Sequence, residues 1–159
     1  MIIKNLVEED FSNYKRCAMF IGFPTCTFKC EKECGKKMCQ NSHLATLPAR
    51  EVNIDSILQA YVCNPITQAI VCGGLEPFEQ FDNLLELISR LRNNYRCNDM
   101  VVIYTGYNKE EIKHEVDLLK QYPNIIIKFG RFLVNDHCRY DNVLGVALAS
   151  SNQYAEAIS

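Results

Sequence analysis

The sequence predicts an α/β fold, with one open, curved and mostly parallel sheet of about five or six strands and helices outside it. Two observations predict this fold. Short apolar runs alternate along the chain with segments of helical periodicity, and strands that alternate with helices form parallel βαβ units. The 159 residues suit one domain over 1–159, and a complete α/β barrel needs about 250 residues.

The first half of the chain predicts two strands with a loop and a helix between them. Residues 17–23 form a continuous apolar run, typical of a strand covered on both faces. Residues 26–49 show no periodicity and contain many charged residues, so they predict a long functional loop. A helix is expected over 52–62, where apolar residues recur three and four positions apart. The next apolar run, 69–72, predicts a strand that ends at Gly73-Gly74.

The second half continues the alternation. Its helices are predicted from apolar residues at helical spacing, and its strands from β-branched and aromatic runs. In chain order we expect a helix over 78–92, a strand over 100–104, a helix over 109–122, a strand over 125–129, a loop over 130–142 and a candidate fifth strand over 143–149.

Three unusual segments directly follow predicted strands. They are the cysteine-containing loop, Gly73-Gly74-Leu75-Glu76-Pro77 and Thr105-Gly106-Tyr107. In open parallel sheets, ligands bind at the carboxyl ends of the strands. We therefore expect these segments to line one site.

Composition narrows the class of protein. The net charge is −2 and the pI about 5.9, so no basic field points to nucleic acid. The apolar runs are too short to span a membrane, and the first residues do not resemble a secretion signal. The chain has nine cysteines, and in a cytoplasmic protein clustered thiols indicate metal binding or catalysis.

Four of the cysteines, Cys26, Cys30, Cys34 and Cys39, lie within one polar loop. Thiolates favour iron–sulfur clusters and zinc. A zinc site needs tetrahedral closure by four ligands, which these spacings allow loosely. Three thiolates could instead hold an iron–sulfur cluster and leave one iron open. Reduced thiols without a metal are the remaining interpretation.

Cys26 and Cys30 resemble the opening of the C-x3-C-x2-C motif of radical S-adenosylmethionine (SAM) enzymes. Cys39-Gln40-Asn41 resembles the end of that motif in the glycyl-radical-activating branch. The resemblance implies a 4Fe–4S cluster bound by Cys26, Cys30 and Cys39 in a cluster loop over 24–48. Eight residues separate the second and third cysteines, where the family has two. Cys34 is therefore an alternative third ligand.

Gly73-Gly74-Leu75-Glu76-Pro77 is similar to the family's G-G-E-P element, with Leu75 added. The resemblance implies that SAM is bound by Gln40, Asn41, Gly73, Gly74 and Glu76, although many members have an aromatic residue at the position of Gln40. Lys128 and Arg131 could meet the SAM carboxylate, but each singly is expected to face solvent or a partner. Further segments resemble the activating proteins of anaerobic (class III) ribonucleoside-triphosphate reductase: Tyr104–Tyr107, Phe129–Phe132 and Ser150–Gln153.

The resemblance implies a truncated, partial TIM-like barrel and an anaerobic, cytoplasmic oxidoreductase. Such an enzyme reductively cleaves SAM to a 5′-deoxyadenosyl radical and generates a glycyl radical on a partner enzyme, here anaerobic ribonucleotide reductase. A flavodoxin- or ferredoxin-type protein would donate the electron. Three alternatives remain: a radical SAM enzyme acting on a small molecule of deazapurine type, a non-enzymatic zinc-binding interaction module, and a relative that binds the cluster without cleaving SAM.

Overall fold

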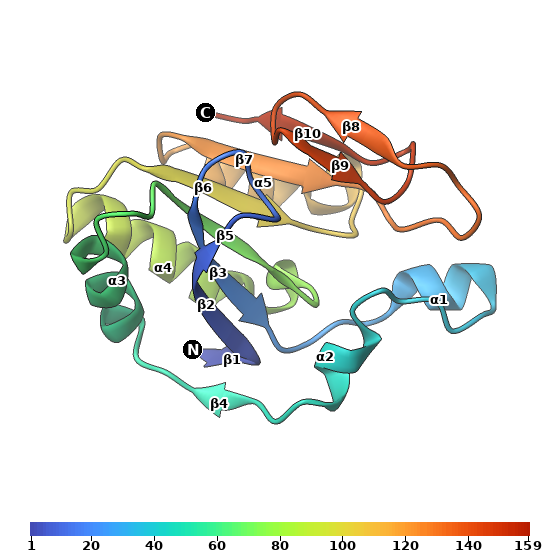
Figure 1. The fold of residues 1–159 in the computed structure, drawn as a ribbon, viewed down its shortest axis with the longest axis horizontal. Helices are drawn as coiled ribbons and strands as arrows, with labels where there is room; N and C mark the ends of the chain where they lie inside the picture. The colour runs from blue at the N-terminus through green and yellow to red at the C-terminus, as the bar shows by residue number, and fades with distance from the viewer.

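The computed structural model describes residues 1–159 and contains a mixed six-stranded sheet in the order β10-β7-β6-β5-β3-β2 (Figure 1). The three central pairings, β3–β5, β5–β6 and β6–β7, are parallel, and the two outer pairings are antiparallel. Because β2 and β10 are free edges, the sheet is not a closed barrel. The strands are β2 (Asn5–Asp10), β3 (Ala18–Phe23), β5 (Ala69–Gly74), β6 (Met100–Tyr104), β7 (Ile125–Phe129) and β10 (Tyr154–Ala157).

Three helices cover one face of this sheet: α3 (Ile54–Cys63), α4 (Phe81–Asn93) and α5 (Lys113–Leu119). The 3₁₀ helices η1 (Pro77–Gln80) and η2 (Lys109–Ile112) lead into α4 and α5. Apolar residues three and four positions apart turn one stripe of each helix toward the strands. On α4 the buried apolar residues are Leu84, Leu87, Ile88 and Leu91.

The opposite face of the sheet carries no helix. A smaller core of eight buried residues lies there, against 23 on the helical face. It is covered by the segment around Tyr14 and by an antiparallel hairpin of β8 (Arg139–Asp141) and β9 (Val146–Leu148). Since this cover is partial, part of the helix-free face is left to line a cavity.

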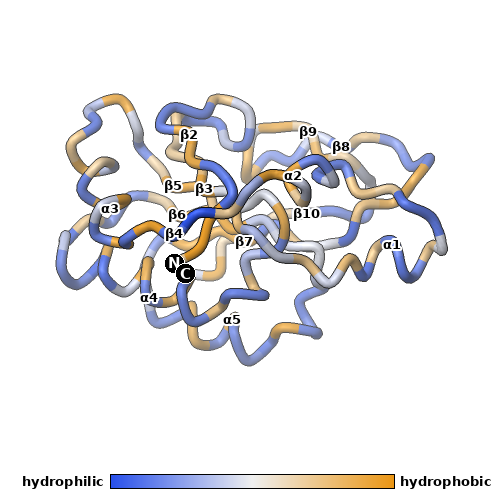
Figure 2. The backbone as a smooth tube through the Cα atoms, turned by 90° about the horizontal axis from the view of Figure 1, so that it is seen from below, coloured by the Kyte–Doolittle hydropathy of each residue, from blue (hydrophilic) through white to orange (hydrophobic).

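Two short helices, α1 (Lys29–Cys34) and α2 (Ser42–Thr46), occupy the long segment between β3 and α3. Helix α1 lies at the periphery of the molecule in both views (Figures 1 and 2). The segment closes with β4 (Arg50–Glu51), which pairs with β1 (Ile2–Ile3). No helix in the structure combines the length and the apolar character that a membrane span requires.

The predicted central strands and the three predicted helices are confirmed, with the third helix ending at Leu119 rather than at 122. The candidate strand over 143–149 is wrong as a member of the main sheet. It contains the turn before β9, and β9 pairs only with β8. The prediction of a loop over 26–49 missed α1 and α2, and the sheet is mixed rather than mostly parallel because both edge strands run antiparallel.

Candidate functional site

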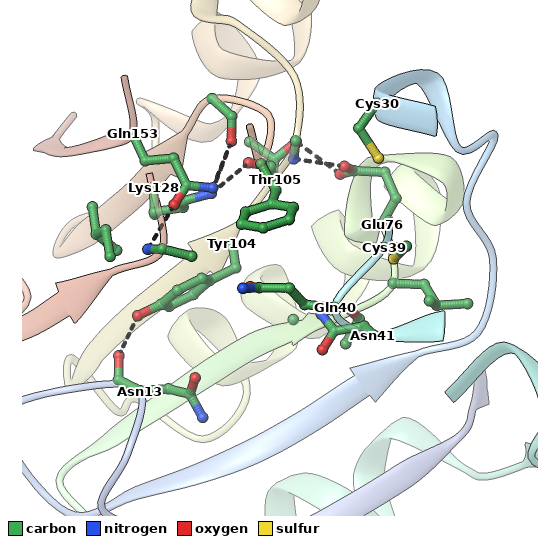
Figure 3. A pocket seen from close by; sticks show the side chains of 18 of the residues that line it. Asn13, Cys30, Cys39, Gln40, Asn41, Glu76, Tyr104, Thr105, Lys128 and Gln153 are labelled. Carbon is green, nitrogen blue, oxygen red and sulfur yellow. Dashed lines mark hydrogen bonds between the residues drawn. The ribbon is translucent and has the colours of Figure 1, made fainter. Parts of the chain in front are cut away.

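A cavity of about 390 Å³ opens on the helix-free face, at the carboxyl ends of the parallel strands (Figure 3). Alternate residues of a strand point to opposite faces. On each parallel strand, the residue two positions after a member of the smaller core lies on the same face as that core. These residues line the cavity: Phe20, Gly73, Tyr104 and Lys128. Tyr104 pairs with Lys128 across β6 and β7. The predicted meeting of the three unusual segments is confirmed, since residues of each line this cavity.

The glycine segment brings the chain close to β3. Gly74 has a φ of +85°, and a Cβ there would lie 2.9 Å from Gly22 Cα. Only glycine suits this position, because both the conformation and the space exclude a side chain. The Gly74 carbonyl accepts a hydrogen bond of 2.7 Å from the side-chain amide of Asn41. Asn41 and its neighbour Gln40 are exposed residues that also line the cavity.

Cys26, Cys30 and Cys39 all line this cavity. The eight residues between the second and third thiols fold outward, as α1 followed by a left-handed turn at Gly35. Glu31 then holds the segment that returns to the cavity. Its Oε1 accepts hydrogen bonds of 3.0 Å from the backbone amides of Met38 and Cys39. This return brings Cys39 back to the cavity that Cys26 and Cys30 line.

Cys34 has a different environment. It lies at the end of α1, is exposed, and does not line the cavity. Its Sγ lies 3.3 Å from the carbonyl oxygen of Lys36 and 3.6 Å from that of Glu31. The structure thus places Cys39, and not Cys34, in the lining of the cavity with Cys26 and Cys30.

The three cavity thiols favour the neutral form when no cation is present. Burial raises the pKa of Cys26 to about 11, with further increases from Glu76, Cys30 and Cys39. Burial and the neighbouring Cys39 raise the pKa of Cys30, and burial raises that of Cys39. Ionisation of all three thiols would therefore need a cationic group in the cavity.

The donor set fits an iron–sulfur cluster better than zinc. Cluster irons take cysteine thiolates, and three half-buried thiols line one cavity. A tetrahedral zinc site needs four closing ligands, and the fourth thiol of the loop lies outside. No three His, Cys, Asp or Glu side chains in the structure are gathered into a metal-coordinating arrangement, so the thiols share the cavity without converging on a common point.

Glu76 is 4% exposed and connects two strand ends. Its Oε1 accepts hydrogen bonds from Thr105 Oγ1 (2.8 Å) and Phe78 N (3.2 Å), and its Oε2 accepts one from Gly106 N (2.9 Å). Burial raises the pKa of Glu76 to about 7, although these hydrogen bonds act to lower it. The carboxylate therefore fixes the Thr105–Gly106 turn while it lines the cavity.

Lys128 is the one cationic side chain among the cavity residues. It is 7% exposed, and its Nζ donates to the carbonyl oxygens of Gly130 (2.9 Å) and Thr105 (3.4 Å). Burial lowers its pKa to about 8, and Glu76 opposes that shift. The expectation that Lys128 faces solvent or a partner is wrong. Arg131 is also largely buried and is ion-paired with Glu111.

Sequence reasoning did not place Gln153 in the cavity, and it expected Lys128 to face solvent or a partner rather than the cavity. Gln153 accepts hydrogen bonds from the amides of Ala149 and Ser150 and donates to Gly130 O. A signal for Lys128 exists in its strand: it lies among apolar residues, at the parity that faces away from Ile125, Ile127 and Phe129. No comparable signal marks Gln153.

The family described as "4Fe-4S single cluster domain" matches residues 14–153 of the chain. That range includes the four loop cysteines and every strand of the sheet except the two at its edges. A comparison with curated proteins finds no match.

Proposed function

Because the chain belongs to the 4Fe-4S single cluster domain family, a domain found in radical SAM-type proteins, we propose that it is a radical SAM activating enzyme whose cluster is held by Cys26, Cys30 and Cys39. One observation carries the proposal. Three thiols from one loop line the same cavity as the Gly73–Glu76 segment, while Cys34 points elsewhere.

When bound, the cluster supplies the electron for the reductive cleavage of SAM. The protein contributes the site around it. The cavity volume of about 390 Å³ lies in the range of roughly 300–1,000 Å³ typical of small-molecule sites. Glu76 fixes the turn beside the thiols, and Asn41 fixes the carbonyl of Gly74. Lys128 and Gln153 offer polar groups across the cavity from Cys30 and Cys39 (Figure 3).

The arrangement of layers suits a partial TIM-like barrel. Helices lie on one face of the sheet only, and the cavity occupies the other, as on the inside of a barrel wall. Free edges at β2 and β10 leave the flanks open. A macromolecular substrate such as the glycine loop of anaerobic ribonucleotide reductase can approach such a site, and a flavodoxin- or ferredoxin-type protein would reduce it.

Anaerobic reconstitution with iron and sulfide tests the proposal. We expect about four irons per chain, and release of 5′-deoxyadenosine after addition of dithionite and SAM. Cys39→Ala should lose the cluster and Cys34→Ala should keep it. One zinc per chain without iron would contradict the proposal, and so would a cluster without 5′-deoxyadenosine in the presence of the reductase.

A further inference from the structure

Helix α1 carries Cys30 but contributes no buried side chain to the core of the protein. It spans six residues, Lys29–Cys34, and none of them is buried. Helices this short are unstable in water without tertiary contacts. Other interactions must therefore hold the helix, and with it Cys30 and the Glu31 carboxylate that ties Cys39.

Those interactions are ionic. Arg131 Nη1 and Nη2 lie 2.8 and 2.6 Å from the two carboxylate oxygens of Glu111. Arg131 Nε lies 3.2 Å from Glu33 Oε2, near enough for an ion pair although not aligned as a hydrogen bond. Lys29 Nζ lies 3.1 Å from Glu111 Oε1. We call these four side chains the charge clamp. Two of them, Lys29 and Glu33, belong to α1.

The other two members are fixed in the body of the protein. Glu111 lies in η2, where its Oε2 also accepts a hydrogen bond of 2.8 Å from the amide of Asn108. The side chain of Arg131 is 10% exposed, and the residue lies two positions after the end of β7. A bidentate arginine–carboxylate pair has a fixed geometry, because both groups are planar. The body of the protein therefore presents two oriented charged groups to α1: the Arg131 guanidinium faces Glu33, and the Glu111 carboxylate faces Lys29.

The clamp also reaches the thiols. Arg131 lines a second, smaller cavity of about 60 Å³ together with Cys26 and Cys30. The ammonium of Lys29 lies 4.7 Å from the ring centroid of Tyr107, which borders the same cavity. The Arg131 guanidinium therefore brings positive charge to a cavity that Cys26 and Cys30 also line.

We propose that Arg131 and Glu111 are positioning residues that hold α1 through Glu33 and Lys29, and so keep Cys30 and Cys39 at the main cavity, while the guanidinium offsets negative charge beside Cys30. The clamp itself exists in the protein without a cluster. Only its effect on the cluster rests on the proposed function.

Hydrogen exchange of the apoprotein tests the clamp. In Arg131→Gln we expect the backbone amides of 29–34 to exchange about tenfold faster, because α1 opens locally once its anchor is lost. The amides of α4 serve as an internal reference and should not change. Arg139→Gln removes an exposed arginine on β8 that has no ion pair, and it should leave α1 unchanged. Wild-type exchange in α1 should rise with salt, whereas that of Arg131→Gln should not.

Glu111→Gln is the second variant, in case Arg131→Gln does not fold. Glutamine can still accept from Asn108 and so preserve the start of η2, but it lacks the charge that Arg131 and Lys29 require. It too should accelerate exchange in α1. If exchange in α1 stays at the wild-type rate in either folded variant, the clamp does not hold the helix and the proposal is overturned.

Measurement of the midpoint reduction potential of the cluster separates the clamp from the proposed function. In reconstituted protein, Arg131→Gln should have a lower midpoint potential than the wild type and Arg131→Lys an intermediate one, because a nearby cation favours the reduced cluster. An unchanged potential in Arg131→Gln would refute the charge effect. Faster exchange in the apo variants of a protein that binds no cluster would support the clamp and refute the proposed function.

Discussion

The side-chain amide of Asn41 donates a hydrogen bond of 2.7 Å to the carbonyl oxygen of Gly74. This bond joins the end of the cysteine loop to the end of β5, two segments that are 33 residues apart in the chain. It holds the residue two positions after Cys39 against the wall of the cavity. The loop is thus attached at both ends, by the charge clamp at α1 and by Asn41 at its return.

Asn41→Ala should loosen this second attachment. Loss of one hydrogen bond costs about 1 kcal/mol, so we expect little change in the melting temperature but weaker SAM binding, by about fivefold, to the reconstituted protein. Calorimetry under anaerobic conditions measures the affinity. Asn94→Ala, at the exposed end of α4, is the control. Equal affinities for the two variants would show that Asn41 does not order the site.

Gly74→Ala should strongly destabilise the protein. The new Cβ would meet backbone atoms of Gly22 and Phe23 at 2.9–3.0 Å, at a φ of +85°. We expect the free energy of unfolding to fall by about 3 kcal/mol. Gly35 also has a positive φ, +67°, but nothing lies within 4 Å of its Cβ position. Gly35→Ala should therefore cost only about 1 kcal/mol. Urea unfolding compares the two, and equal losses would contradict the steric argument.

Lys128→Met should affect ligand binding more than folding. Burial disfavours the charged form of Lys128 and lowers its pKa to about 8. The cost of desolvating the ammonium therefore offsets much of what its hydrogen bonds contribute. We expect the unfolding free energy to stay within about 1 kcal/mol of the wild type and the affinity for SAM to fall about tenfold or more. Lys37→Met removes an exposed lysine of the cysteine loop that has no ion pair and serves as the control. Unchanged SAM affinity in Lys128→Met would remove this residue from the proposed site.

The ion pair between Glu111 and Arg131 predicts a dependence of stability on pH. The hydrogen bonds from Arg131 are the main cause that lowers the pKa of Glu111 from 4.5 to about 2. The folded state therefore binds the proton less well than the unfolded state. The stabilisation is complete above pH 4.5 and is lost as the pH falls toward 2. The stability difference between wild type and Glu111→Gln should shrink over this range in urea unfolding. A constant difference would contradict the shift.

The central strands could be predicted from the sequence because both of their faces are buried. Ile70 and Val71 lie on opposite sides of β5, and both are fully buried, so the strand is continuously apolar. The edge strands give no such signal. β2 has the sequence Asn-Leu-Val-Glu-Glu-Asp, and its residues from Val7 to Glu9 are exposed. Its pairing with β3 decides its structure, and local sequence does not contain that pairing.

In the site too, some parts could be predicted from the sequence and others could not. The residues at the strand ends, such as Gly73 and Thr105, could be placed together because parallel strands end at one edge of a sheet. Helix α1 could not, because it depends on Arg131 and Glu111. In the chain, Arg131 lies about a hundred residues after α1 and Glu111 about eighty residues after it. Those ion pairs are properties of the tertiary structure, and a window of the sequence around Cys30 contains only one half of each.

The return of the chain at Glu31 separates the spacing of cysteines along the chain from their spacing in the site. Extra residues inserted between Cys30 and Cys39 project into solvent, so evolution can lengthen or shorten this interval without rebuilding the sheet. A motif search that fixes two residues between the second and third cysteines would pass over this chain, although its Cys39 lines the same cavity as Cys26 and Cys30.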